Sequence, residues 1–201
     1  MSLILASAST ARAAMLRQAG LDFSIVPARV DETEIKRGLQ AEGASVREAA
    51  EALAELKALR GTPPAGGLGD DSFVIGADQM LACDGRWYDK PADLAEARAQ
   101  LLSLRGKTHE LVSAVVLMRN GSAIWRHAET AKLTMRDFSD GFLDAYLAQA
   151  GDAVLQSVGC YQLEGLGVQL FSRIQGDFFT ILGLPLLPLL DMLRNHQLVR
   201  T

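Results

Sequence analysis

The sequence is poor in cysteine, has no excess of positive charge and contains no long hydrophobic run. Its two cysteines, Cys83 and Cys160, stand far apart and form no CxxC or Cys/His spacing. This pattern favours two reduced thiols in the core over a zinc site or a disulfide, as is typical of a cytosolic protein. The formal net charge of −4 argues against a broad binding surface for DNA, RNA or anionic membranes. A small basic pocket in an acidic protein is still compatible with it.

Neither end of the sequence has a pattern for export or membrane insertion. Residues 1–5 turn polar too soon for the apolar part of a signal peptide, and they lack a basic flank. The apolar residues 181–193 include two prolines and Asp191 and are too few to span a bilayer. We therefore expect a cytoplasmic protein that binds neither membranes nor nucleic acids. Its 201 residues suit one large domain or two small lobes.

One apolar stretch near the middle of the sequence is followed by a carboxylate. Residues 73–75 favour a buried strand, and Gly76 would let another backbone come close. Asp78 and Gln79 follow directly. Because ligands bind at the carboxyl ends of strands in open α/β sheets, Asp78 is placed where catalytic groups are found. The alternative is a carboxylate that merely caps a turn or the next helix.

The N-terminal region predicts an anion site. Residues 3–6 favour a short buried strand, which leads into a helix that ends at Gly20. Three hydroxyl side chains could cap this helix: Ser7, Ser9 and Thr10. Its free N–H groups would bind an anion. Arg12 in the first turn opposes the helix dipole, which is easier to understand if an anion lies between them. A solvated arginine beside a capped helix is the alternative.

Two lysines are also placed to reach a ligand. Lys57 lies on a helix that begins at a capping box of Ser45 and Glu48, and it shares a face with small apolar residues. Its ammonium could extend past the core to solvent, or it could meet a phosphate at the rim of a pocket. Lys90 precedes Pro91, which restricts it to an extended conformation and so fixes the direction of its ammonium.

The remaining sequence alternates between short strands and helices. Asn120-Gly121 is the strongest two-residue hairpin signal and predicts two long strands around it. The acidic segment at 30–34 is expected to be a loop, either a solvated turn or a source of carboxylates for a hard cation. A linker is expected at 61–71 and a glycine-rich loop at 159–167. The other expected elements are a helix capped by Asp93, a helix starting at Ser139, strands at 168–171 and 178–182, and a final helix at 185–194. This order indicates an α/β fold with a mixed twisted sheet flanked by helices, in two lobes around a cleft.

Eight short stretches occur in the order and spacing found in the Maf family, which the chain resembles from about residue 3 to residue 194. They are LASASTAR at 5–12, DE at 31–32, AELKA at 54–58, GAD at 76–78, KP at 90–91, LRGKTH at 104–109, EG at 164–165 and GLP at 183–185. No single stretch is specific, but their ordered combination is. The family is known for nucleoside triphosphate pyrophosphatases, also called septum-formation inhibitor proteins, whose fold is similar to that of inosine triphosphate pyrophosphatases.

The resemblance implies a single Maf-like domain over residues 1–201, with the nucleotide in the cleft between its lobes. Enzymes of this family hydrolyse a nucleotide between its α- and β-phosphates. They release a monophosphate and pyrophosphate, and they use a divalent cation, Mg²⁺ or Mn²⁺. Family members are often dimers, so a homodimer is a further expectation.

The resemblance also implies roles for residues already singled out. Asp78 matches the proton acceptor that activates water, directly or through the metal, and Glu32 matches an acidic position near the metal. The expected phosphate-binding residues are Ser7, Ser9, Arg12, Lys57 and Lys90. Because Arg12, Lys57 and Lys90 would serve the ligand and not the core, alanine at any of these three positions should impair turnover without unfolding the protein.

Three residues depart from the pattern of the family. Thr10 and Ala11 stand where the family usually has proline and a second basic residue. That basic residue is dispensable if Arg12 does its work. Thr180 stands where asparagine is usual, which weakens the case for a polar contact from that segment.

Arg12, Gln79 and Glu164 bear on the choice of substrate. Relatives that act on dTTP and UTP typically have threonine after the catalytic aspartate and glutamine where Glu164 stands, whereas Gln79 and Glu164 resemble the subgroup that acts on 7-methyl-GTP. A carboxylate can accept from the N1–H and N2–H₂ edge of guanine, but against a pyrimidine carbonyl it would stay unpaired at a cost of about 1–3 kcal/mol. The positive charge of a methylated base would also favour an aromatic platform such as Tyr161 or Trp87.

Several alternatives stay open at this point. Glu164 could face solvent or bind metal, in which case it would not recognise the base. The enzyme could instead hydrolyse dTTP or UTP, or inosine or xanthosine triphosphate. The chain could also be a nucleotide-binding regulator of septum formation with little turnover. Asp78, Lys57 and Lys90 argue against a regulator, because a pure binder has no need of a carboxylate that activates water.

Overall fold

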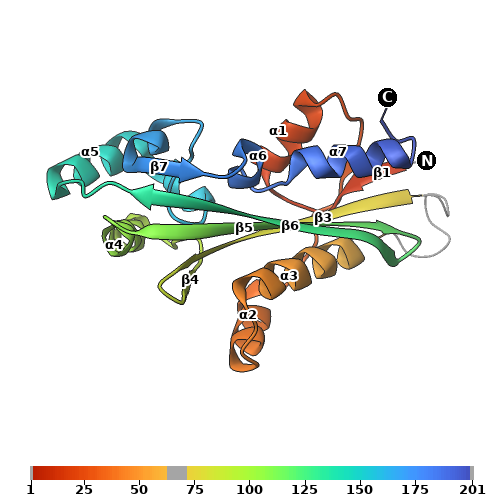
Figure 1. Cartoon of the computed structure of the whole chain (residues 1–201), viewed down its shortest axis with the longest axis horizontal. Coiled ribbons are helices and arrows are strands. Elements are labelled where there is room, and N and C mark those ends of the chain that lie inside the picture. The colour runs from red at the N-terminus through yellow and green to blue at the C-terminus, as the bar shows by residue number, and fades with distance from the viewer. Residues whose placement is uncertain (1, 63–71, 200–201) are drawn as a thin grey trace. The chain divides into compact units, whose positions relative to one another are not determined.

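The computed structural model describes residues 2–62 and 72–199, so that most of the predicted linker lies outside it (Figure 1). The strands among these residues are β1 (Ser2–Leu5), β2 (Ser24–Ile25), β3 (Ser72–Cys83), β4 (Arg86–Tyr88), β5 (Thr108–Arg119), β6 (Ser122–Met135) and β7 (Phe171–Gln175). The helices are α1 (Thr10–Gln18), α2 (Glu32–Ala41), α3 (Val46–Gly61), α4 (Leu94–Leu104), α5 (Asp140–Ala150), α6 (Phe178–Ile181) and α7 (Leu186–Asn195), with the 3₁₀ helices η1 (Gly151–Gln156) and η2 (Leu166–Leu170). None of these helices is long and apolar enough to cross a membrane.

The strands form a mixed sheet in the order β2-β1-β3-β5-β6-β7, with β4 paired to β3. β1 runs parallel to both β2 and β3, whereas the pairs β3–β4 and β6–β7 are antiparallel. The predicted hairpin joins β5 to β6. Both Asn120, with φ 51°, and Gly121, with φ 73°, adopt the left-handed conformation that a tight hairpin turn requires. The predicted α/β fold with a mixed sheet and flanking helices is confirmed.

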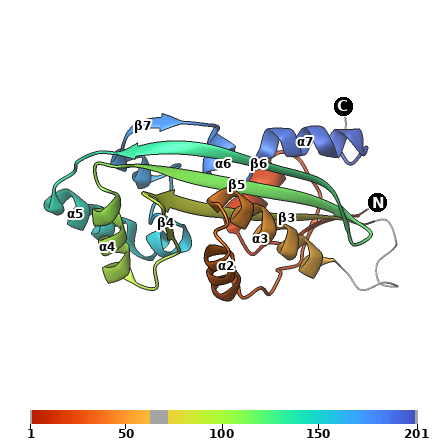
Figure 2. The same ribbon diagram turned by 60° about the horizontal axis from the view of Figure 1, so that its bottom comes forward.

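The chain divides into two compact units, which we call unit 1 and unit 2. Unit 1 comprises Met1–Gln79, Ser113–Glu129 and Gly183–Thr201, and unit 2 comprises Met80–Val112 and Thr130–Leu182. Figure 1 shows α1 and α7 on one face of the strands of unit 1 and α3 on the other. The turned view in Figure 2 keeps α3 and α7 on opposite faces, and α2 packs against α3. The strands of unit 1 are therefore covered on both faces.

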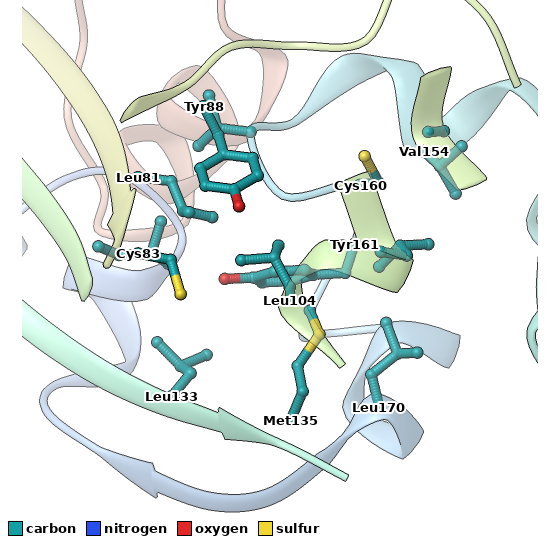
Figure 3. Close-up of a cluster of buried hydrophobic side chains, with 14 of the residues drawn as sticks. Leu81, Cys83, Tyr88, Leu104, Leu133, Met135, Val154, Cys160, Tyr161 and Leu170 are labelled. Atoms are coloured by element: carbon teal, nitrogen blue, oxygen red, sulfur yellow. The ribbon is translucent and has the colours of Figure 1, made fainter. Parts of the chain in front are cut away.

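The core of unit 2 forms where α4, α5 and η1 pack together and β3 and β6 contribute apolar side chains. Figure 3 shows Cys83 and Cys160 among the leucine and tyrosine side chains of this core. Both cysteines are buried and unpaired, as predicted. Burial raises the pKa of Cys160 to about 12 and also raises the pKa of Cys83, so both remain protonated thiols near neutral pH.

His109 belongs to the same interior and has no access to solvent. Its Nε2 lies 2.7 Å from the hydroxyl of Tyr161, and burial lowers the pKa of the histidine to about 4. His109 is thus a neutral core residue at physiological pH. Tyr161 is only 4% exposed, so its predicted use as a stacking platform for the base is wrong.

Three predicted segments differ from the structure. The expected acidic loop at 30–34 contains the start of α2, because the carboxylate of Asp31 accepts the backbone N–H of Glu34 at 3.1 Å. The strand expected at 178–182 is α6, capped in the same way by Asp177. The strand expected at 168–171 is mostly η2, and β7 begins only at its last residue. Short apolar runs do not distinguish helix from strand. An aspartate cap favours the helix in α2 and α6, whereas η2 has no side-chain cap.

Candidate active site

Asp78 lies within a long strand and not at its end. The prediction that the strand stops before Asp78 is wrong, because β3 continues to Cys83. It is the neighbouring strand that stops: the last pair between β1 and β3 is Leu5 with Ile75, and one more hydrogen bond joins Ala6 N to Ile75 O at 2.8 Å. Asp78 therefore follows the carboxyl end of its parallel neighbour β1, the edge where α/β sheets place ligands.

Gly76 allows α3 to pack directly on β3. A Cβ atom added at Gly76 would lie 2.2 Å from the backbone oxygen of Ala54 and 2.5 Å from the backbone nitrogen of Ala58. The predicted close approach of another backbone is confirmed, and that backbone is α3. Lys57 stands on the same turn of α3, so this contact brings its ammonium to Asp78.

We expect Gly76→Ala to destabilise the protein and reduce turnover together. The added methyl group must push α3 away from β3, and such overpacking costs about 1–3 kcal/mol. For a protein of this size each kcal/mol lowers the unfolding temperature by roughly 2–4 °C. Thermal unfolding followed by circular dichroism and a turnover assay measure the two effects.

Gly38→Ala is the matched control for this substitution. Gly38 also lies in a helix, but a Cβ atom there would have nothing within 4 Å. Alanine at this position should leave stability unchanged or raise it by about 0.4–1 kcal/mol. An unfolding temperature of Gly76→Ala equal to that of Gly38→Ala would show that α3 is not held by this contact.

Lys57 forms ion pairs with two carboxylates, those of Asp78 and Glu32. Its Nζ lies 2.5 Å from Asp78 Oδ1 and 2.6 Å from Glu32 Oε1, while Lys36 approaches Glu32 at 3.8 Å. The side chains of Asp78 and Lys57 are 5% and 12% exposed, and that of Glu32 is 41% exposed. The prediction that Lys57 shares a buried face of its helix is confirmed, and its ammonium does not extend to open solvent.

The two carboxylates differ in their surroundings. Burial alone would raise the pKa of Glu32, but the charge of Lys57 and its hydrogen bond hold that pKa below the usual value, with smaller contributions from Lys36 and Arg12. In Asp78, Oδ1 bonds to Lys57, whereas Oδ2 is buried and has no hydrogen-bond partner among the described residues. A buried carboxylate oxygen without a partner is costly, so Oδ2 is available to a ligand or a water molecule.

Arg12 is buried beside these carboxylates. Its Nε donates to Gly183 O at 2.8 Å, and its Nη1 donates to Ala77 O at 2.9 Å and to Ser7 Oγ at 3.2 Å. The alternative of a solvated arginine is therefore wrong. Burial lowers the pKa of Arg12, and the negative charges of Asp78 and Glu32 partly offset that shift. These bonds tie Arg12 to the protein, so the expectation that its charge does not serve the core is also wrong.

Ser7 and Ser9 lie just before the start of α1. Ser9 is the N-cap and accepts the backbone N–H of Arg12 at 3.3 Å, while Ser7 Oγ accepts the backbone N–H of Ser9 at 3.2 Å. Because both hydroxyl oxygens accept these bonds, each can donate its own proton to an anion at the helix N-terminus. Thr10 is the first residue of α1 and is exposed.

Gln79 points to the opposite face of β3 from Asp78, as neighbours on a strand do. Its Nε2 donates to the hydroxyl of Ser113 on β5 at 3.0 Å, which holds the amide in place. Ser113 has no solvent access and was missed by the sequence analysis. A hydroxyl inside the otherwise apolar run of β5 was the only signal for it.

The remaining predicted site residues belong to unit 2. Lys90 follows β4 and is exposed, and Glu164 is exposed on the turn before η2. Thr180 is buried in α6. The predicted residues that the structure brings together all lie in unit 1: Ser7, Ser9, Arg12, Glu32, Lys57 and Asp78.

The carboxylates of this cluster fit a hard cation that is shared with a ligand. Asp78 and Glu32 both approach Lys57, and Asp78 Oδ2 still lacks a partner in the described part of the chain. No group of three or more His, Cys, Asp or Glu residues suited to a metal ion occurs in that part. Mg²⁺ is commonly bound through one or two carboxylates with substrate phosphates completing its coordination, which agrees with a pair of acidic side chains beside an anion site.

Comparisons with known proteins find relatives in sequence and in structure. The family described as "Maf-like protein" matches residues 2–196. A "Nucleoside triphosphate pyrophosphatase" of Paramagnetospirillum magneticum is 60% identical over 98% of this chain and 100% of that protein. A "7-methyl-GTP pyrophosphatase" of Rhizobium meliloti is 52% identical over 96% of this chain and 94% of that protein. Among solved structures, a dITP/XTP pyrophosphatase from Mycobacterium abscessus has 18% identity and a TM-score of 0.44 over 98% and 94% of the two chains.

An α/β protein with two carboxylates, a lysine and a buried arginine beside a helix N-terminus has the elements of a phosphate-handling enzyme. The chain belongs to the Maf family, and as a Maf-type nucleoside triphosphate pyrophosphatase it is a hydrolase.

Proposed function

We propose that the cluster in unit 1 is the active site and that it hydrolyses the bond between the α- and β-phosphates of a nucleoside triphosphate. The observation that carries this proposal is the state of Asp78. Its carboxylate is buried, Oδ1 is held by Lys57, and Oδ2 has no partner among the described residues. A fixed carboxylate with one unengaged oxygen is suited to accept a proton from an attacking water molecule.

The surrounding groups neutralise and orient the phosphates. Ser7, Ser9 and the first N–H groups of α1 offer donors, and Arg12 and Lys57 offer positive charge. Lys90 remains a predicted phosphate-binding residue. Charge moves toward the pyrophosphate as the bond breaks, so fixed cations near it stabilise the transition state more than the substrate.

Glu32 and Asp78 would hold the divalent cation, Mg²⁺ or Mn²⁺. When bound, such an ion neutralises phosphate oxygens and lowers the pKa of water. The contribution of the chain is to keep Glu32 ionised. Lys57 does this for Glu32, whose pKa lies below its usual value.

The substrate that we propose is 7-methyl-GTP. Glu164 is exposed and can accept hydrogen bonds from the N1–H and N2–H₂ edge of guanine. The positive charge of the methylated base favours that carboxylate over a neutral side chain. The relative named for 7-methyl-GTP is about half identical to this chain over nearly all of its length, which supports the proposal.

We expect faster hydrolysis of 7-methyl-GTP than of dTTP, UTP or unmodified GTP, and we expect Glu164→Gln to reduce this preference. A panel of nucleotides is incubated with Mg²⁺ or Mn²⁺, and released pyrophosphate is measured as kcat/KM for each nucleotide. Losing the hydrogen bonds to a charged acceptor costs about 1.5–3 kcal/mol, which corresponds to roughly a tenfold change or more.

Glu42→Gln is the control for this experiment, because Glu42 is an exposed glutamate at the end of α2. It should leave the order of substrates unchanged. Faster hydrolysis of dTTP or UTP than of 7-methyl-GTP by the unmodified protein would refute the substrate assignment. Failure to release pyrophosphate from any nucleotide would refute the proposed site and reaction as a whole.

A further inference from the structure

The ammonium of Lys57 lies between the two carboxylates that are proposed to hold the divalent cation. Its Nζ is 2.6 Å from Glu32 Oε1 and 2.5 Å from Asp78 Oδ1, so one positive charge bridges side chains of α2 and β3. We propose that Lys57 occupies the cation position of the ligand-free enzyme, and that the divalent ion takes this position only when Lys57 transfers to the phosphates of the substrate. This inference rests on the proposed function and adds to it an exchange of cations.

The charges of the cluster explain why the exchange requires substrate. Glu32 and Asp78 carry two negative charges, and Lys57, Lys36 and Arg12 carry three positive charges, so the cluster has a formal charge of +1. A divalent ion alone would find one oxygen of each carboxylate already engaged and would add two positive charges to a mostly buried cluster. A polyphosphate brings negative charge and offers the ammonium new acceptors at the same time.

The side chain of Lys57 can move while its backbone stays fixed. Ala54 and Ala58 are fully buried on α3, and the contact at Gly76 holds this part of the helix against β3. The lysine reaches the carboxylates through a flexible four-carbon stem whose ammonium has three donors. Rotation of that stem is enough to free both carboxylates, with no movement of the helix.

The variant Lys57→Met tests the exchange. The affinity of the protein for Mn²⁺ is measured without nucleotide, either by calorimetry or from the electron paramagnetic resonance signal of the free ion. Methionine keeps much of the length and apolar character of the stem but removes the charge. Without nucleotide, we expect the unmodified protein to bind Mn²⁺ weakly and Lys57→Met to bind it about tenfold more tightly or more. A nucleotide with a methylene group between its α- and β-phosphates should tighten Mn²⁺ binding in the unmodified protein, and less so in Lys57→Met.

Lys36→Met is the matched control. Lys36 also faces Glu32, but at 3.8 Å, a longer distance than the 2.6 Å between Lys57 Nζ and Glu32 Oε1. A gain in Mn²⁺ affinity confined to Lys57→Met supports the exchange. An equal gain in both variants would reduce the effect to removal of a nearby charge and would overturn it, as would unchanged or weaker binding by Lys57→Met. Lys57→Gln, which is neutral and keeps a hydrogen-bond donor, replaces Lys57→Met if circular dichroism shows that the methionine variant is unfolded.

The outcomes for the inference and for the proposed function can be told apart. If the unmodified protein releases pyrophosphate but Lys57→Met binds Mn²⁺ no more tightly than the unmodified protein does, the proposed function is supported and the exchange of cations is refuted. If Lys57→Met binds Mn²⁺ more tightly than the unmodified protein but the unmodified protein hydrolyses no nucleotide, the role of Lys57 at the cation position is supported and the proposed reaction is refuted.

Discussion

Asp78→Asn is expected to lower kcat by about 10²–10⁴-fold while nucleotide binding largely survives. Asparagine has nearly the same size and can still accept the hydrogen bond from Lys57, which now lies 2.5 Å from Oδ1. It cannot take a proton from water, and it places an amide where Oδ2 has no hydrogen-bond partner among the described residues. The loss therefore falls on the chemical step. Pyrophosphate release gives kcat, and equilibrium binding of a non-hydrolysable nucleotide gives affinity.

Asp84→Asn is the matched control for Asp78→Asn. Asp84 is also paired with a lysine, Lys107, at 3.0 Å, but its side chain is 70% exposed. Its positive φ of 51° is a conformation that asparagine tolerates well. Turnover by Asp84→Asn should match that of the unmodified protein. Near-normal kcat in Asp78→Asn, or an equal loss in both variants, would remove Asp78 from the proposed role.

Local signals in the sequence predicted local structure well. Ser45 and Glu48 form the expected capping box at the start of α3, and the hairpin turns where Asn120-Gly121 predicted. Gly76 allows the close backbone approach that its place beside a strand indicated. Each of these features depends on the conformational preferences of a few neighbouring residues, and a single sequence contains that information.

The errors concern where a strand ends and which short segments are helical. Asp78 and Gln79 look like the end of a strand, yet β3 continues because its later residues pair with β4, for example Leu81 with Tyr88. The missed helix α2 has only a short apolar pattern, although Asp31 followed by Glu34 was a usable N-cap signal. The helix α2 therefore agrees with a local signal that the sequence contains.

The residues that form the site were more predictable than the ion pairs and hydrogen bonds between them. The residues of unit 1 that were expected to handle phosphate do lie together, because the Maf resemblance identified them by position. No feature of the sequence indicated that Lys57 would bridge Glu32 and Asp78, or that Arg12 would donate to the carbonyl of Gly183. Those contacts join segments that meet only after the sheet and its helices have assembled.

The hydrogen bonds of Arg12 lead to the second large expected effect: Arg12→Ala should lower both stability and turnover. Alanine leaves Ala77 O and Gly183 O without the donor that Arg12 provides, whereas Ser7 Oγ keeps the N–H of Ser9, and a buried group without its partner costs about 1–3 kcal/mol. A total of about 3 kcal/mol corresponds to a fall in unfolding temperature of roughly 6–12 °C at this chain length. Loss of one preorganised donor to the developing charge should lower kcat/KM by about 10²-fold or more.

Arg17→Ala separates these effects from a general response of α1. Arg17 lies on the same helix, but it is exposed and its guanidinium packs over the ring of Phe23 at 5.5 Å. Its removal should change stability by no more than about 1 kcal/mol and leave kcat/KM unaltered. If Arg12→Ala unfolds at the same temperature as Arg17→Ala yet loses turnover, Arg12 serves the ligand alone and its bonds to Ala77 and Gly183 contribute nothing to the fold. If Arg12→Ala is destabilised but hydrolyses triphosphates normally, the arginine has a structural role only, and the proposed phosphate site must rely on Lys57 and the N-terminus of α1.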